Sequence, residues 1–420
     1  IDYTADAVIA EGKVALTGNT RMDSSTGWPS RIDVSGNGLE LAILLDKKLP
    51  EGLNIDGKLN TSANLSYREP QRLTGKIEIR SASGTLAHPL LEGEIEQWDY
   101  RDIELDLEID NDGARANGSM AIGNNSLRAQ IDLPGANLAN FGSKSQRLRG
   151  NAEILLQDVS LLEVLIPDIQ RTGGSLQLSL TADGNLGQPK LGARAQMRQA
   201  NLQIPRLGLE LEQINLQANS DQSGLLTFSV SARSGEGQIR LQGSTQLDAA
   251  LGWPTTVSVE GENFEAVRIP EATVNLSPRL EVRLKDRNID IEGEVTVPYA
   301  KLQPRVVTTA AMVSNDAVVI GGDQPADSKW QINSRVRLLL GDRVTFFGYG
   351  FEASLGGNLI IEENPGVPTR GTGEITIPEG RYRAYGQNLD VENGRLLFTG
   401  GPVDNPGLDV RAIRKTRDVI

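Results

Sequence analysis

The nine residues Asp102-Ile103-Glu104-Leu105-Asp106-Leu107-Glu108-Ile109-Asp110 alternate strictly between acidic and aliphatic side chains. Successive side chains of a β-strand point to opposite faces of a sheet. The four aliphatic residues therefore share one face of the strand, and the five carboxylates share the other. This stretch predicts a strand with an apolar face and a charged face.

The same period of two recurs along much of the chain. Aliphatic residues alternate with polar ones at Leu176/Leu178/Leu180, Ile239/Leu241, Leu280/Val282/Leu284, Ile289/Ile291 and Leu389/Val391. Residues typical of turns separate the runs, as at Asn111–Gly113, Asp183–Asn185, Ser234–Gly237, Glu379–Gly380 and Asn393–Gly394. The pattern predicts an all-β protein, a long and repetitive sheet.

Signals for helices are few. Residues 159–169 carry Leu161, Leu162, Leu165, Ile166 and Ile169 at helical spacing, with Asp158 as a possible N-cap and Pro167 as the end. We interpret this stretch as a short cap that plugs the sheet, with a membrane-surface helix as the alternative. Residues 136–141 are a second candidate. Neither stretch is long enough to cover a sheet.

Internal repeats support an architecture built from similar units. The segment from Gly18 through Gly27-Trp28-Pro29 to Gly36 has the same spacing as the segment from Gly243 through Gly252-Trp253-Pro254 to Gly261. A second pair starts at Gly84 and Gly184, each in a Gly-x-Leu-x-x-Pro-x-Leu pattern. Repeats of this kind indicate units that bury their apolar faces only against their neighbours.

The strands leave more apolar surface than the helices can cover. At about 12 to 16 residues per strand and turn, roughly 25 to 35 strands fit, and their stack extends on the order of 120 to 170 Å. An open sheet of that size is expected to curl. Another sheet, the same sheet folded over, or a ligand must cover the aliphatic faces. The residues expected to line such a groove are Ile103, Leu105, Leu107, Ile109, Leu176, Leu178, Leu180, Leu280, Val282, Leu284, Ile289 and Ile291.

Composition excludes several classes of function. The 420 residues carry a net charge of −13, which argues against binding of nucleic acid. The chain has no cysteine and one histidine, His88, so thiolate and multi-histidine metal sites are excluded. We expect no enzyme activity and no cofactor. His88 is interpreted as a turn residue, with a Ser-His-Asp triad left as an alternative.

The acidic residues and glycine pairs have simpler interpretations than chemistry. The carboxylates of 102–110 are interpreted as the solvated face of a strand, with calcium ligands or paired catalytic carboxylates as the alternative. Gly348-x-Gly350 and Gly356-Gly357 are expected at bulges, and Gly400-Gly401-Pro402 at a turn. No apolar run approaches the length of a membrane span. Both ends of the sequence look like cuts within strands, so we expect an export signal or anchor to lie outside it.

Near the end of the chain the sequence contains motifs that are specific enough to compare with a known family. They are Gly373-Glu-Ile-Thr-Ile-Pro-Glu-Gly380-Arg-Tyr, then Tyr385-Gly386-Gln-Asn-Leu, then Asn393-Gly394-Arg-Leu-Leu-Phe-Thr-Gly400-Gly401-Pro402-Val-Asp-Asn405-Pro406-Gly407-Leu-Asp-Val-Arg-Ala. This sequence resembles the C-terminal region of the TamB family, inner-membrane subunits of the translocation and assembly module. The resemblance covers most of the chain and is sharpest over 338–412. The Gly-x-Leu-x-x-Pro repeats are similar to those of AsmA-like relatives.

The resemblance implies a fold, a location and partners. The fold is a "β-taco", a long sheet curled into a trough with an apolar interior. Residues 1–300 would form a repetitive AsmA-like region, and 301–420 the start of the C-terminal domain, truncated at its end. The location would be the periplasm, with an anchor in the bacterial inner membrane. The partners would be phospholipid acyl chains and a TamA-like outer-membrane barrel of the Omp85 type. The missing last strands put binding to that barrel in doubt for this chain.

Three functions remain open at this stage. The first is a periplasmic bridge that conducts phospholipids between the inner and outer membranes. The second is a scaffold or chaperone that templates strands of outer-membrane β-barrel proteins and autotransporters by β-augmentation. The third, and weakest, is a polysaccharide-degrading enzyme or adhesin on a β-helix, because aromatic residues that stack on sugars make up only 4% of the chain.

Overall fold

The structure is a computed structural model that describes residues 1–21, 29–45, 49, 52–68, 72–89, 95–166, 168–304, 330–384 and 387–414. Strands account for 78% of the described residues and helices for 5%. The described residues form 24 strands and only two short α-helices, which confirms the predicted all-β fold class. No helix among the described residues is long and apolar enough to cross a membrane.

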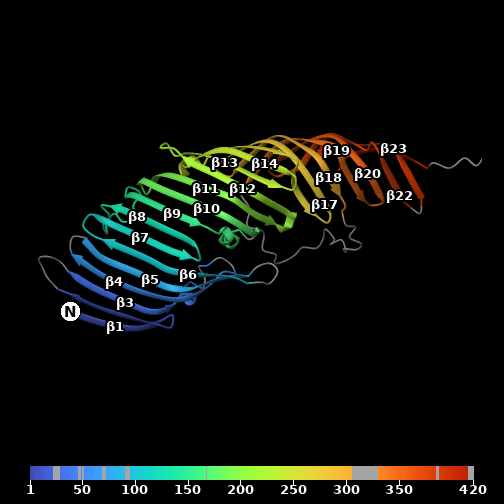
Figure 1. The fold of residues 1–420 in the computed structure, drawn as a ribbon. Coiled ribbons are helices and arrows are strands. Elements are labelled where there is room, and N and C mark those ends of the chain that lie inside the picture. The colour runs from blue at the N-terminus through green and yellow to red at the C-terminus, as the bar shows by residue number, and fades with distance from the viewer. Residues whose placement is uncertain are drawn as a thin grey trace, which may run out of the picture. The chain divides into compact units, whose positions relative to one another are not determined.

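Two compact units divide the chain (Figure 1). Unit 1 comprises residues 1–200, 215–226 and 247–250, and unit 2 comprises 201–214, 227–246 and 251–420. Strands β11 (Gln188–Ile204), β12 (Leu209–Ser220) and β13 (Leu225–Ser234) contribute residues to both units. The predicted division after residue 300 stays a prediction.

Unit 1 is an antiparallel meander, because each strand from β1 to β10 pairs with the next strand along the chain. Its strands are β1 (Asp2–Ile9), β2 (Gly12–Thr20), β3 (Ser30–Glu40), β4 (Asn54–Arg68), β5 (Arg72–Pro89), β6 (Ile95–Ile109), β7 (Gly113–Ile122), β8 (Asn125–Pro134), β9 (Arg147–Leu156) and β10 (Gln170–Asn185). Its helices are α1 (Leu41–Leu45), the 3-10 turn η1 (Val159–Leu161) and α2 (Leu162–Leu165).

Among the described residues of unit 2, β18 and β19 pair in parallel, and the other strand pairs from β14 to β24 are antiparallel. Its strands are β14 (Gly237–Gln246), β15 (Thr255–Glu262), β16 (Phe264–Ile269), β17 (Ala272–Lys285), β18 (Asn288–Leu302), β19 (Gln331–Gly348), β20 (Phe351–Asn364), β21 (Val367–Thr376), β22 (Gly380–Ala384), β23 (Gln387–Pro402) and β24 (Gly407–Ile413). The 3-10 turns η2 (Pro205–Leu207) and η3 (Ala249–Leu251) complete the elements. The pairings give no support to a β-helix, whose strands run parallel.

The strand count falls just below the expected number of about 25 to 35 because several strands are long. β5 and β19 each run for 18 residues. Such strands are longer than the usual five or six residues of a globular protein, so each must bend or twist to stay within one sheet.

Aligned β-bulges bend the strands of unit 1. The register shifts between Gly36 and Leu39 in the pair β3–β4, and between Gly57 and Asn60 in the pair β4–β5. It shifts again between Arg101 and Glu104 in the pair β6–β7. An extra residue on one strand of a pair kinks that strand and increases its twist. Bulges in neighbouring strands therefore fold the sheet along a line.

Unit 2 also contains β-bulges in neighbouring strands. Its register shifts fall between Glu265 and Val267, Asn275 and Ser277, Val297 and Tyr299, and Leu340 and Val344. Beside these shifts a small core forms from buried Val297, Ala300 and Val344. Leu338 and Leu340, which precede the shift in β19, pack against this core, so apolar side chains from both sides of the bulge come together.

The predicted Gly-Trp-Pro repeat is visible in the register. Thr20 pairs with Ser30 between β2 and β3, and 225 positions later Thr245 pairs with Thr255 between β14 and β15. The hydroxyl oxygens lie 2.9 Å apart in the first pair and 2.7 Å apart in the second. Of the first copy, residues 22–28 lie outside the described residues.

The correspondence extends to glycines and aromatic rings at the same offset. A Cβ at Gly18 would overlap the ring of Tyr3, and one at Gly243 would overlap the ring of Phe228. Both glycines therefore make room for an aromatic ring on the preceding strand. The repeat is a repeated three-strand unit and not a chance similarity of turns.

The predicted helix at 159–169 is present but shorter. The side chain of Asp158 accepts a hydrogen bond from the Ser160 amide at 3.0 Å, so the predicted N-cap is correct. The helical turns end at Leu165, and Pro167 lies outside the described residues. No pattern in the sequence predicts α1.

The predicted helix at 136–141 is wrong. Those residues form turns in which the Asn137 carboxamide accepts bonds from the backbone amides of Ala139 and Asn140. Asparagine side chains that bond to the nearby backbone compete with helix formation.

The turn signals had mixed outcomes. Asn111–Gly113 and Ser234–Gly237 are hairpin turns as predicted, and Glu379 is in a bend that ends at Gly380. Asp183–Asn185 remains in β10, and Asn393–Gly394 lies within β23, directly after a bulge between Val391 and Asn393. Gly400-Gly401-Pro402 and His88 were also predicted in turns, but they lie within strands β23 and β5.

The buried side chain of Tyr100 stabilises the bend of unit 1, and a substitution at the neighbouring Gly84 tests this role. Its side chain is fully buried, and its hydroxyl lies 2.9 Å from the hydroxyl of Ser81. A Cβ at Gly84 would overlap the Asp56 carbonyl oxygen and the Tyr100 hydroxyl. We expect Gly84→Ala to lower the free energy of unfolding by about 2 kcal/mol, because overpacking forces backbone shifts. Denaturant unfolding measures this change.

Gly118→Ala is the matched control on the same sheet. A Cβ at Gly118 would have only ordinary contacts, at 3.7 and 3.8 Å. We expect a change within about 0.5 kcal/mol for this variant. Equal losses in the two alanine variants would contradict the role of Tyr100.

Candidate functional site

The seven predicted groove residues of unit 1 share one face of the sheet. Cross-strand partners lie on the same face, and a continuous row runs from Leu105 through Gly118, Ala129 and Ala152 to Leu180. The bulge in β6 sets two residues against one, so Tyr100 and Trp98 also face this side. The structure therefore brings Ile103, Leu105, Leu107, Ile109, Leu176, Leu178 and Leu180 to a common surface.

None of these seven side chains is fully buried. Leu105 and Leu180 are 41% and 39% exposed, and the other five are half-buried. The row contains small residues between the leucines, so the surface has a shallow aliphatic floor. We call this surface of unit 1, on β5 to β10, the trough face.

The five predicted residues of unit 2 form a second apolar surface. Val282 lies opposite Ile291, and Leu284 lies opposite Ile289. Leu280 lies opposite Gly293. All five side chains are half-buried. They are distinct from the small closed core around Val344 in the same unit.

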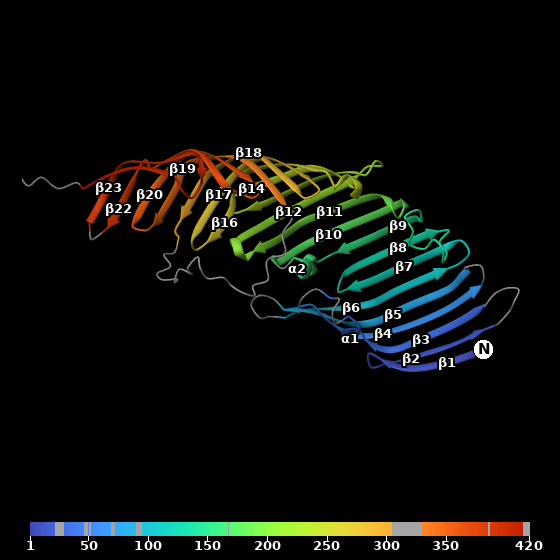
Figure 2. The same ribbon diagram turned by 180° about the vertical axis from the view of Figure 1, so that it is seen from behind.

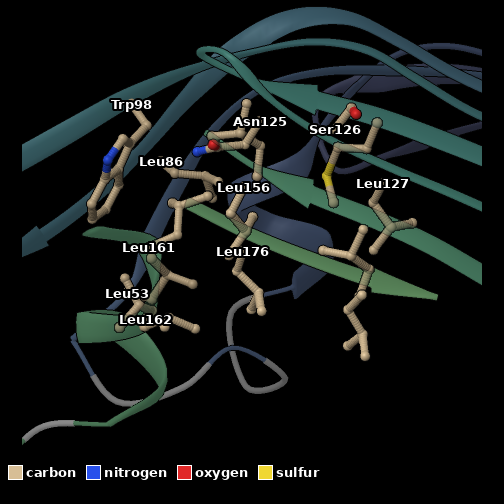
Figure 3. Close-up of a pocket in the computed structure, with 15 residues that line it drawn as sticks. Leu53, Leu86, Trp98, Asn125, Ser126, Leu127, Leu156, Leu161, Leu162 and Leu176 are labelled. Atoms are coloured by element: carbon tan, nitrogen blue, oxygen red, sulfur yellow. The ribbon is translucent and has the colours of Figure 1, made fainter. Parts of the chain in front are cut away.

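A pocket of about 430 Å³ lies on the trough face of unit 1 (Figure 3). One wall is the sheet, where six strands from β5 to β10 contribute side chains. The other wall is formed by η1, α2 and Leu53. The lining residues are Leu53, Leu86, Trp98, Met120, Ile122, Asn125, Ser126, Leu127, Ile154, Leu156, Leu161, Leu162, Val164, Leu176 and Leu178.

The second wall, which we call the cap, comprises residues 158–165. Figure 2 shows α2 beside β10. Leu161, Leu162 and Val164 line the pocket from this side, opposite Leu176 and Leu178 of the sheet. The predicted short cap over the sheet is thus present, and it encloses a space instead of filling it.

Hydrogen bonds of Asn125, Glu163 and Trp98 hold the cap to the sheet. The Asn125 amide oxygen accepts hydrogen bonds from the backbone amides of Gln157 at 2.8 Å and Asp158 at 3.1 Å. Buried Glu163 accepts from the amide and the hydroxyl of Thr172 at 2.7 and 2.8 Å. The Trp98 indole donates to the Ser160 hydroxyl at 3.3 Å. These bonds satisfy polar groups that would otherwise face an apolar space.

Acidic side chains surround the cap. Burial raises the pKa of Glu96, and the nearby carboxylates of Glu163 and Asp158 raise it further. Glu96 lies two residues before Trp98 on β6 and directly opposite His88 of β5. A carboxylate in this position is less stable than one in water.

The opposite face of the sheet is charged and paired. Arg80 contacts Asp106 at 2.7 Å and Glu104 at 3.7 Å, and Lys76 contacts Asp106 at 3.8 Å. Glu104 and Asp106 therefore form ion pairs across strands, as expected for a solvated face. Among the described residues, no group of three or more His, Cys, Asp or Glu side chains is arranged to hold a metal ion.

Sequence reasoning missed the polar supports of the pocket. Asn125 follows a turn and carries no motif, and its role depends on a partner more than thirty positions away. Trp98 stood outside the alternating runs because a bulge reverses the face of β6 after it. A pattern of strict alternation cannot reveal a residue whose face is set by a bulge.

The fold and the lining define a class: a β-trough protein whose curled sheet presents an aliphatic interior and a charged exterior. Comparisons with known proteins agree. The family model for the TamB N-terminal domain matches residues 21–192, and the model for the TamB C-terminal domain matches residues 228–420. The chain belongs to the TamB family.

Two curated proteins are similar to this chain over different shares of its length. The chain is 23% identical over 401 residues to the translocation and assembly module subunit TamB of Haemophilus influenzae, a match that covers 88% of this chain and 29% of that relative. The chain thus spans less than a third of that protein. It is also 28% identical over 141 residues to the beta subunit of an ADP-forming succinate–CoA ligase of Aliivibrio fischeri, 32% of each chain.

The ligase similarity carries no argument for catalysis. Helix N-termini often hold nucleotide phosphates, and the two α-helices of the described residues have only five and four residues. Neither matching family model describes an enzyme.

The cap's attachment can be tested through Asn125. Asn125→Ala leaves two backbone amides without an acceptor, and each unpaired buried donor costs about 1 to 3 kcal/mol. We expect a loss of stability of about 2 kcal/mol and faster hydrogen exchange of the amides in residues 157–165, measured by mass spectrometry. Asn219→Ala, which removes an exposed acceptor for Arg194, should change neither quantity. Unchanged exchange in the cap of Asn125→Ala would contradict this assignment.

The raised pKa of Glu96 predicts a pH dependence. A carboxyl whose pKa is raised by folding takes up a proton more readily in the folded state, so folding gains stability as the pH falls through that pKa. Glu96→Gln removes the unfavourable charge and should raise the Tm at pH 7. The gain should shrink toward pH 4, where Glu96 of the parent is protonated. Thermal unfolding at both values measures it, with the exposed Glu212→Gln as a control. A gain that is the same at both pH values would count against the burial of Glu96 as its cause.

Proposed function

We propose that this chain is part of a periplasmic bridge along which phospholipids move between the inner and outer membranes. The acyl chains would lie on the trough face, and the head groups would stay in water. The observation that supports this proposal is the continuous aliphatic row across β6 to β10, whose side chains the protein leaves partly open.

The energetics favour such a path. An acyl chain that crosses water exposes its methylenes at about 0.8 kcal/mol each, or roughly 12 kcal/mol for a chain of about 16 carbons. A chain that slides along aliphatic walls stays out of water at each step. Leucine, isoleucine and alanine give these walls no polar group that would arrest the chain.

Location and partners follow from the family and belong to this proposal. Family membership supports a role in the translocation and assembly module. The proposed setting is the periplasm, with an anchor in the inner membrane outside this chain. The proposed protein partner is a TamA-like Omp85 barrel in the outer membrane, and the role would extend to outer-membrane biogenesis.

The alternative function, a scaffold for barrel proteins, requires a different structural feature. β-Augmentation needs a strand edge with free backbone groups. Strands β2 to β9 are paired on both sides, so their backbone groups are already used. Their side chains on the trough face are the groups left to bind a ligand.

Site-specific crosslinking in cells tests the proposal. A photoreactive residue at Leu105 or Leu178 should capture phospholipid, since both positions face the trough. The same residue at Asp106, on the charged face beside Leu105, should capture none. Adducts with nascent barrel proteins alone, and no lipid at Leu105 or Leu178, would overturn the conduit and favour the scaffold.

A charge on the trough face should also block transport. Leu105 is 41% exposed, so Leu105→Asp is expected to fold with a Tm close to that of the parent. Its carboxylate would require each passing chain to contact a hydrated charge, which is costly. We expect phospholipid delivery to the outer membrane to fall about tenfold or more. Glu104→Asp is the control on the outer face, and normal delivery by a folded Leu105→Asp would argue against the path.

A further inference from the structure

The capped pocket of unit 1 differs from the rest of the trough face because it is walled on two sides. Among its fifteen lining residues only Asn125 and Ser126 are polar. The Asn125 amide oxygen is already occupied by two backbone amides, at 2.8 and 3.1 Å. The space between cap and sheet is therefore a hydrocarbon environment with little left to hydrogen-bond to.

We propose that this pocket is a fixed binding site for one acyl chain of a phospholipid, whose head group stays outside the pocket. This inference rests on the proposed function. It adds to the lipid path one fixed binding site, which we call the station. The cap would hold one chain against the sheet while the second chain and the head group remain in the open trough.

The volume matches one chain. A carbon of a hydrocarbon chain takes up about as much space as a water molecule in the liquid, roughly 30 Å³, so about 14 carbons fit in the pocket. The pocket's 430 Å³ is at the small end of the usual range for ligand pockets, about 300 to 1,000 Å³. Two chains of that length would need about twice this volume.

The chemistry of the walls argues against a peptide. The strands that form the sheet wall are paired with their neighbours, from β5 to β10. An incoming strand would find no free backbone edge, and its own amides would be buried without partners. Such burial costs several kcal/mol.

The charges near the cap argue against a free fatty acid held by its carboxylate. None of the lining residues is cationic. Two carboxylates belong to the cap, those of Asp158 and Glu163, and that of Glu96 lies near them, with His88 opposite Glu96. An acid group at the mouth would be repelled, whereas a methyl end can enter without electrostatic cost.

Trp98 lines the pocket and reports directly on its occupant. The chain has four tryptophans, so replacing Trp28, Trp253 and Trp330 with Phe leaves Trp98 as the single emitter. The full chain is titrated with phosphatidylcholine whose acyl chains carry bromine, a contact quencher of indole fluorescence. We expect saturable quenching of at least about half the emission at about one lipid per chain. The same lipid without bromine should not quench.

A filling variant and its matched control locate the site. Val164 lines the pocket from the cap, so Val164→Phe should occupy the space and weaken quenching about tenfold in lipid concentration. Val367→Phe makes the same change at a position of unit 2 that is 43% exposed and lies outside the predicted groove, and it should leave the Trp98 titration within about twofold of the parent. The parent titration decides the proposal even if Val164→Phe fails to fold.

The outcomes separate this proposal from the conduit itself. If Trp98 is not quenched while crosslinkers at Leu105 capture phospholipid in cells, the station is wrong and the conduit stands. If neither signal is seen, both are wrong. Quenching that a folded Val164→Phe leaves unchanged would also overturn the station, because the lipid would then contact Trp98 from outside the pocket.

Discussion

The structure depends on one constraint: each strand carries an aliphatic face that the chain cannot cover with helices. Water disfavours exposed apolar surface in proportion to its area. The aligned bulges partly resolve this by bending the strands. Beside the bulges of unit 2, the buried side chains of Val297, Ala300 and Val344 form a small core. On the trough face of unit 1 the leucines stay half open, and an apolar ligand would complete their burial.

The polar components serve the same constraint from the other side. Ion pairs such as Arg80 with Asp106 cover the outer face, although exposed pairs contribute little to stability individually. Their value here is specificity, because a register slip of one residue would put carboxylates on the trough face. The cap is the exception, since Asn125 and Glu163 place hydrogen bonds inside the apolar region. Those bonds fix a helical turn that has only four α-helical residues.

Much of the architecture could be predicted from the sequence. The alternation at 102–110 placed Leu105 and Leu107 on one face correctly, and Asp158 marked the start of the cap. The bulges could not be predicted, because they insert single residues such as Asp102 that look like part of a regular alternation. The parallel pairing of β18 with β19 was also hidden, because period-two alternation does not specify strand direction. The pocket required residues from six strands and the cap, a set that no local pattern identifies.

The 225-residue offset between the two three-strand units has a consequence for how such a protein acquires its length. Each three-strand segment contains its own pair of hydroxyl groups between two strands and its own aromatic ring beside a glycine. A duplicated copy therefore brings these contacts with it and needs no new partner elsewhere. Every inserted strand lengthens the sheet by about 4.8 Å and leaves its cross-section unchanged. Duplication of a gene segment can therefore increase the length of the sheet in small steps.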